Sequence, residues 1–142
     1  MKYKYQLIIL GTTENPIVKE ILNQIETKIT DLKLPKNILN IINRDNINTE
    51  YGGNQPAFSI YFGDKEGNFN DLDITKKLIE DGTMILPIFY ADFSKEIPKI
   101  LENQNGIQFD NNELDRIANI VLQAFELLRN TRKVFISYKR SE

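Results

Sequence analysis

Short apolar stretches, each bounded by turn residues, alternate along this chain with segments of helical periodicity. Four stretches have the length and the apolar density of buried strands: Tyr5–Leu10, Ile38–Asn43, Ala57–Phe62 and Thr83–Tyr90. A shorter fifth candidate is Ile107–Phe109. Parallel strands need crossover connections, usually helices, so this alternation predicts an α/β fold. We expect a flavodoxin-like parallel sheet of about five strands in the order 2-1-3-4-5, with helices on both faces.

Residues that favour turns and helix ends mark the connections in the first half of the chain. Asn15 and Pro16 are expected to open the first helix, as its cap and its first-turn proline, and Leu34–Pro35 to close it. The segment Arg44–Pro56 is rich in turn formers and has no helical period, so we predict a loop there. Pro87 cannot donate to a ladder, which predicts that the fourth strand is kinked or lies near an edge at that point.

Similar signals divide the second half. Asp71 or Asp73 is expected to cap a short helix that Gly82 ends, and Ser94 to cap the helix after it. The last helix is predicted to run without interruption over 111–130, because apolar residues recur along one face of it.

Composition excludes several kinds of chemistry. Neither histidine nor cysteine occurs in the 142 residues, which removes Ser-His-Asp and Cys-His catalysis, disulfides and thiolate-bound metal sites from this stretch of chain. The 18 basic residues are scattered among 20 acidic ones for a net charge of −2, which argues against general nucleic-acid binding. No apolar run approaches the roughly 20 residues of a membrane span, and the first run is too short for a signal peptide. We expect a cytoplasmic location and no membrane partner.

The segment 132–142, with the sequence RKVFISYKRSE, resembles the opening of bacterial TIR (Toll/interleukin-1 receptor) domains, in which a strand of the form VFISY precedes a basic, polar turn. The stretch before it, from ILPIF to LLRNTRK, looks like the region that precedes the TIR domain in bacterial proteins with an N-terminal extension. The resemblance implies two units: an N-terminal α/β domain over 1–131, which could itself be TIR-like in fold, and the first strand of a TIR domain over 132–142.

Bacterial TIR domains of this kind are typically NAD-cleaving enzymes or producers of nucleotide signals in antiphage immunity. Their catalytic glutamate lies on a helix well downstream of the FISY strand, so the resemblance places catalysis beyond this chain, with NAD+ as the substrate of the parent protein and no cofactor in this part. The N-terminal module is then expected to sense a small-molecule or phage-derived trigger, to form homo-oligomers, or to hold its own TIR domain inactive.

Two segments are candidate ligand sites. Gly11, Thr12, Thr13 and Asn15 follow the first strand, where doubly wound folds bind phosphates on free backbone N–H groups, although no glycine-rich fingerprint is present and Glu14 would repel a phosphate. An ordinary strand-to-helix turn is the favoured interpretation there. The loop that contains Tyr51, Gly52 and Gly53 could form a lid or a contact surface, and a polar loop without function is the alternative.

Five acidic residues have simpler interpretations. Asp64, Glu66, Asp71 and Asp73 are closely spaced, yet they do not fit the EF-hand spacing, and a solvated turn followed by a helix cap explains them. Glu80 is interpreted as a surface residue, because the serine and aromatic partners expected before a TIR glutamate are missing.

Three functional hypotheses remain open from the sequence. The first is a regulatory or interaction module. The second is a nucleotide- or signal-binding domain with its ligand at the carboxyl ends of the first and third strands, where the strand order reverses. A free-standing flavodoxin-like enzyme is the least favoured, since the chain has neither His nor Cys and no phosphate fingerprint.

Overall fold

The computed structural model describes residues 5–127, which form a five-stranded parallel sheet in the order β2-β1-β3-β4-β5. The predicted fold class and strand order are therefore confirmed. The strands are β1 (Tyr5–Gly11), β2 (Leu39–Ile42), β3 (Ala57–Phe62), β4 (Met84–Phe89) and β5 (Ile107–Gln108). The longest pairing joins β1 to β3, from Gln6 opposite Ala57 to Gly11 opposite Phe62. These two strands form the centre of the sheet.

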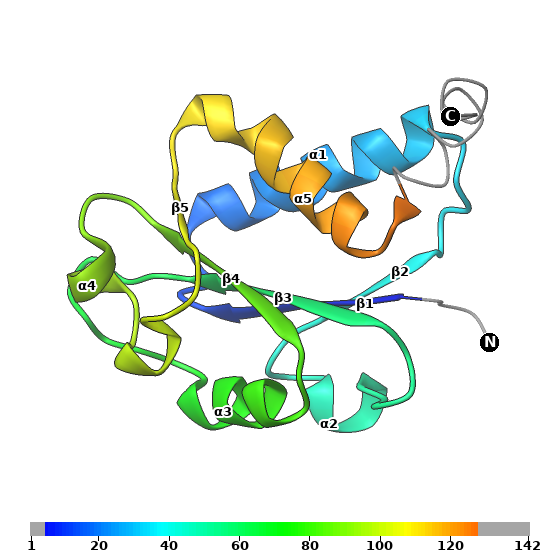
Figure 1. Ribbon diagram of the computed structural model, residues 1–142. Coiled ribbons are helices and arrows are strands. Elements are labelled where there is room, and N and C mark those ends of the chain that lie inside the picture. Colours follow the sequence, from blue (N-terminus) through cyan, green and yellow to red (C-terminus); the bar gives the residue numbers. More distant parts are fainter. Residues whose placement is uncertain (1–4, 128–142) are drawn as a thin grey trace, which may run out of the picture.

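Helices cover both faces of the sheet (Figure 1). On one face lie α1 (Pro16–Asp31) and α5 (Leu114–Ala124), and on the other lie α2 (Ile47–Glu50) and α3 (Leu72–Glu80). Alternate residues of β1 serve the two faces, as strand geometry requires. Leu7 and Ile9 belong to the core beneath α1 and α5, whereas Ile8 and Leu10 belong to the core beneath α2 and α3. Both faces of the central strand are thus buried.

Several local predictions hold. The side chain of Asn15 accepts a hydrogen bond from the Ile17 amide at 3.0 Å, and Pro16 follows as the first helical residue of α1. Gly82 ends α3 with φ at +82°, the left-handed conformation predicted for it. The Pro87 prediction also holds, because β5 pairs with β4 only at Ile88 and Phe89 and leaves the β5 side of Pro87 without a strand neighbour in the described chain.

The predictions for Arg44–Pro56 and for Ser94 are wrong. The segment predicted as a plain loop contains the single helical turn α2, which is held in place by the buried side chain of Ile47. Ser94 is not a helix cap: α4 (Phe93–Glu96) is capped by Asp92, whose carboxylate accepts the Ser94 amide, and Pro98 separates it from a 3-10 turn at Lys99–Leu101. Ser and Asp are both good caps, so the sequence alone did not choose between neighbours.

The last helix is shorter than predicted. It begins with a 3-10 turn at Asn111–Glu113, continues as α5 and ends at Ala124. Glu126 then adopts φ of +62°, which breaks the helical path and places Leu127, 2% exposed, in the core. The predicted continuous helix to residue 130 is therefore wrong at 125–126, and its remaining part lies outside the described residues. No glycine or proline marks this break in the sequence.

The arrangement supports a prediction about the domain boundary. Since residues 5–127 already bury both faces of β1 and β3, we expect the chain truncated after Thr131 to fold without the segment 132–142. Circular dichroism and thermal melting would be compared for the two lengths, with a cooperative transition expected in both. Loss of cooperative unfolding in the shorter chain would contradict the boundary.

Candidate functional site

The predicted phosphate turn begins at Gly11, the last residue of β1. Its φ is +89°, and a side chain there would overlap the backbone carbonyl oxygen of Phe62 on β3. Glycine is therefore required both by the left-handed backbone and by the close approach of the two strands. The turn brings Thr12, Thr13 and Asn15 to the carboxyl edge of the sheet, at the reversal of strand order where the sequence placed a possible ligand.

An ion pair of the protein itself fills this position. Arg44, just after β2, donates from Nε and Nη2 to the two carboxylate oxygens of Asp71, at 2.8 Å each. The same guanidinium donates to the Gly11 carbonyl at 2.6 Å and to the Thr13 hydroxyl at 3.2 Å. Asp71 in turn accepts the Gly11 amide at 2.9 Å. The Asp71 carboxylate thus accepts the backbone N–H group to which a bound phosphate would otherwise bind.

Burial makes this pair a structural element. The Asp71 side chain is 6% exposed and that of Arg44 is 35% exposed. The hydrogen bonds with Asp71 hold the pKa of Arg44 above its ordinary value. Asp71 also adopts φ of +63°, a strained conformation for a residue with a Cβ. The side chain does not cap α3, as the sequence had suggested, but crosses to the end of β1.

Neighbouring polar groups at this edge are also engaged. Asp64 accepts the Thr12 hydroxyl at 3.2 Å and the amides of Glu66 and Asn68, and these backbone hydrogen bonds lower the pKa of Asp64. The interpretation of Asp64 as part of a turn is confirmed. Among residues 5–127, no group of three or more acidic side chains is placed to hold a metal ion.

Tyr90 and Glu96 complete the edge near β4. The Asn15 amide donates to the Tyr90 hydroxyl at 3.2 Å. Burial, and next the charge of Glu96, raises the pKa of Tyr90 to about 12, so this phenol stays protonated at neutral pH. Glu96 is 2% exposed and accepts the amides of Tyr90, Ala91 and Asp92 at 2.6–2.9 Å. Glu96 therefore holds the turn after β4 by accepting three consecutive backbone amides.

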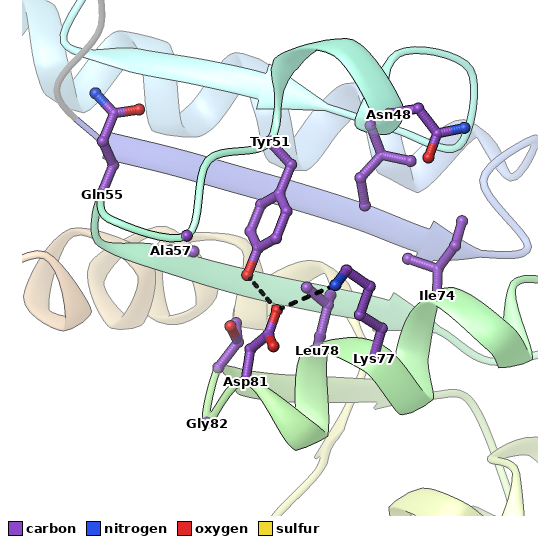
Figure 2. A pocket seen from close by; sticks show the side chains of 12 residues that line it. Asn48, Tyr51, Gln55, Ala57, Ile74, Lys77, Leu78, Asp81 and Gly82 are labelled. Atoms are coloured by element: carbon purple, nitrogen blue, oxygen red, sulfur yellow. Dashed lines mark hydrogen bonds and ion pairs between the residues drawn. The ribbon is translucent and has the colours of Figure 1, made fainter.

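An open pocket lies elsewhere, between α2 and α3 (Figure 2). It has a volume of about 660 Å³. Its floor is apolar, and Figure 2 shows Tyr51 directed from the loop after α2 toward Asp81 at the end of α3. The Tyr51 hydroxyl donates to Asp81 at 2.9 Å, and the Lys77 ammonium lies 4.0 Å from the same oxygen. The lining residues are Ile47, Asn48, Tyr51, Gly53, Gln55, Ala57, Ile74, Lys77, Leu78, Asp81, Gly82 and Thr83.

A buried glutamine fixes the loop that carries Tyr51. Gln6 is 1% exposed, and its amide nitrogen donates to the carbonyls of Gly52 at 2.8 Å and Gln55 at 3.1 Å. Its amide oxygen accepts the Gly52 N–H at 2.7 Å. Three hydrogen bonds from one buried side chain anchor the loop to β1, so this wall of the pocket is preformed. The arrangement favours a contact surface over a lid.

The structure separates the sequence-predicted residues into two groups. Gly11, Thr12, Thr13 and Asn15 lie at the carboxyl edge of the sheet, whereas Tyr51, Gly52 and Gly53 lie at the amino edge, beside Gln6. Since β1 rises about 3.3 Å per residue, Gly11 and Gln6 are about 16 Å apart. The two groups cannot form one small site. Tyr51 and Gly53 line the α2–α3 pocket, and Glu80, on the same helix as Lys77, is exposed as predicted.

Sequence patterns alone did not single out the residues that decide this geometry. Arg44 and Asp71 are 27 residues apart and each stands among ordinary turn formers. Gln6 could have been noticed as a polar residue inside the first apolar run. Lys77 and Asp81 carry an i,i+4 spacing that indicates one helix face, but not a pocket.

Comparison with known proteins leaves the fold without an assigned relative: no family model matches the chain, and neither a curated protein nor a solved structure matches it significantly. Within residues 5–127 no helix has the length and apolar character needed to span a membrane. Any statement about function therefore depends on the residues and the geometry described above.

The closed carboxyl edge yields a stability prediction. Arg44→Ala should lower the free energy of unfolding by about 2–4 kcal/mol, because it leaves the carboxylate of Asp71 buried without its cation. Adding Asp71→Asn should recover part of this loss, since asparagine carries no charge and tolerates the left-handed backbone. Urea unfolding of the single and double variants would measure the coupling.

An exposed pair provides the control. Arg116→Ala removes an ion pair between α5 and Glu113 of the preceding 3-10 turn, so the expected loss is only about 0.5 kcal/mol or less. If the Arg44 and Asp71 substitutions were instead additive within about 0.5 kcal/mol, the two side chains would not act as a unit.

Proposed function

We propose that this chain contains a regulatory or interaction module of a bacterial TIR-domain protein, whose NAD+-cleaving part follows it. The support from the sequence is the resemblance of 132–142 to the first TIR strand. The support from the structure is that the element leading toward this segment is built into the core of the module. A change in the module would therefore reach the segment that follows.

The packing of α5 is the observation that carries the proposal. Lys28 of α1 lies 2.6 Å from Asp115 of α5, and Gln24 donates to the same carboxylate at 3.4 Å. At the other end of α5, the ring of Phe125 lies 5.0 Å from that of Tyr5 and 6.4 Å from that of Phe58. These two ring contacts join the end of α5 to β1 and β3. These contacts pack α5 against the rest of the domain at both of its ends.

A sensing role is the form of regulation that the α2–α3 pocket favours. Its volume of about 660 Å³ falls within the range of small-molecule sites, and its polar wall is anchored by Gln6. A phosphate at the carboxyl edge, the other location considered from the sequence, would have to displace the Asp71 carboxylate from both Gly11 and Arg44. The pocket needs no such displacement.

The proposal predicts that the connection after the module transmits regulation. In the full-length protein, about ten Gly/Ser residues inserted after Asn130 should leave both domains folded and change the ratio of triggered to basal NAD+ cleavage, because a random-coil linker transmits no orientation. The measurement is the NADase rate with and without the trigger, or with forced oligomerisation where no trigger is known.

The same insertion after Gln104, in the exposed turn before β5, is the matched control and should leave the ratio unchanged. An unchanged ratio for the Asn130 insertion would reduce this connection to a tether. A full-length protein with no NAD+ cleavage under any condition would contradict the TIR part of the proposal.

A further inference from the structure

One wall of the α2–α3 pocket carries the carboxylate of Asp81. Asp81 is the C-cap residue of α3, where the helix dipole places partial negative charge and an acidic side chain is unfavourable. Its carboxylate is 35% exposed and faces the pocket. The Tyr51 hydroxyl holds one of its oxygens in place at 2.9 Å. The Asp81 carboxylate and the end of α3 are therefore both sources of negative charge at this wall.

The cation that faces Asp81 is held loosely. The Lys77 ammonium is 4.0 Å away, at the limit of an ion pair, and its side chain is 65% exposed. By contrast, the guanidinium of Arg44 lies 2.8 Å from Asp71 at the closed edge. An exposed i,i+4 pair on one helix contributes little to stability. A second cation could thus replace the lysine at little cost.

The remaining lining suits an apolar body beside that charge. Leu78 is fully buried and Ile47 is 8% exposed, so both form the floor, and Ile74 is partly exposed beside them. Burial is the largest influence on the Tyr51 phenol and raises its pKa, while a hydrogen bond with Thr83 acts in the opposite direction. The hydroxyl therefore remains a donor to Asp81 at neutral pH, which leaves the carboxylate able to accept from a ligand.

From these contacts we infer that the α2–α3 pocket binds a small organic cation, a primary ammonium group on an apolar or aromatic body, with the ammonium on Asp81 and the body over Ile47, Ile74 and Leu78. The ligand's ammonium takes the place of that of Lys77. Phosphate-bearing ligands are disfavoured, because the carboxylate and the helix end would repel them. This inference gives the sensing form of the proposed function a ligand class, and it rests on that function only for its biological meaning.

Binding can be tested on the 142-residue chain by NMR, without any TIR activity. Phenethylamine is the probe, with 2-phenylethanol as its uncharged counterpart and 3-phenylpropionate as its anionic one. We expect phenethylamine to shift the amide signals of Tyr51, Asp81 and Thr83 saturably, with a Kd of about 1 mM or tighter for a ligand of this size. The two counterparts should bind at least tenfold more weakly.

Variants separate the charge from the fold. Asp81→Asn keeps an oxygen that can accept from Tyr51 but removes the charge, and should weaken phenethylamine at least tenfold. Glu80→Gln removes the neighbouring exposed carboxylate at the same helix end and should change the affinity less than twofold. Lys77→Met removes the competing ammonium from an exposed side chain and should tighten binding about threefold or more.

The inference is overturned by equal binding of 2-phenylethanol, by full affinity in Asp81→Asn, by weaker binding in Lys77→Met, or by no saturable shift with the amine. Shifts confined to Gly11–Asn15 would place binding at the carboxyl edge instead and would equally overturn it. Because none of these readouts uses NAD+ cleavage, failure here leaves the regulatory proposal standing, and failure of that proposal leaves the pocket measurement valid.

Discussion

The carboxylate of Asp71 joins two groups at the carboxyl edge, because it accepts both the Gly11 amide at the end of β1 and the Arg44 guanidinium after β2. In a parallel sheet all strands end at the same edge, and the backbone groups of the first turn need partners from a ligand or from the protein. Here the protein supplies its own anion. With Arg44 also on the Gly11 carbonyl, both polar groups of Gly11 are satisfied and the turn into α1 is fixed.

The opposite edge has a different arrangement. The buried side chain of Gln6 forms hydrogen bonds with the loop after α2, with both the N–H and the carbonyl of Gly52. This leaves the outer side of the loop, with Tyr51, facing the pocket beside α3 (Figure 2). Among residues 5–127 no buried side-chain polar atom lacks a hydrogen-bond partner. One edge is closed by the fold, and the other is a preformed surface.

Sequence patterns predicted the sheet well, because buried parallel strands are continuous apolar runs and their crossovers carry caps and glycines. The predictions for the cap residue Asn15 and the helix-ending Gly82 are confirmed, since each residue type has one strong local use.

The patterns failed where one residue type serves two purposes. Asp71 stands at a helix start yet binds across the sheet, and Glu126 adopts a left-handed conformation next to the buried Leu127. Neither event leaves a local signal, since the partners are distant in sequence. For the same reason, the separation of Gly11 from Tyr51 became visible only with the topology.

Asp71 closes the carboxyl edge in the folded protein, and the ligand site that we propose lies instead in the α2–α3 pocket. Native-state hydrogen exchange at the Gly11 amide tests whether Asp71 holds this position in solution, with the exposed Gly53 in the anchored loop as reference. We expect the Gly11 amide to exchange only through global unfolding, whereas the Gly53 amide should exchange by local fluctuation. If Gly11 exchanged as fast as Gly53, the carboxylate would not occupy this position in solution, and the carboxyl edge would be open to a ligand after all.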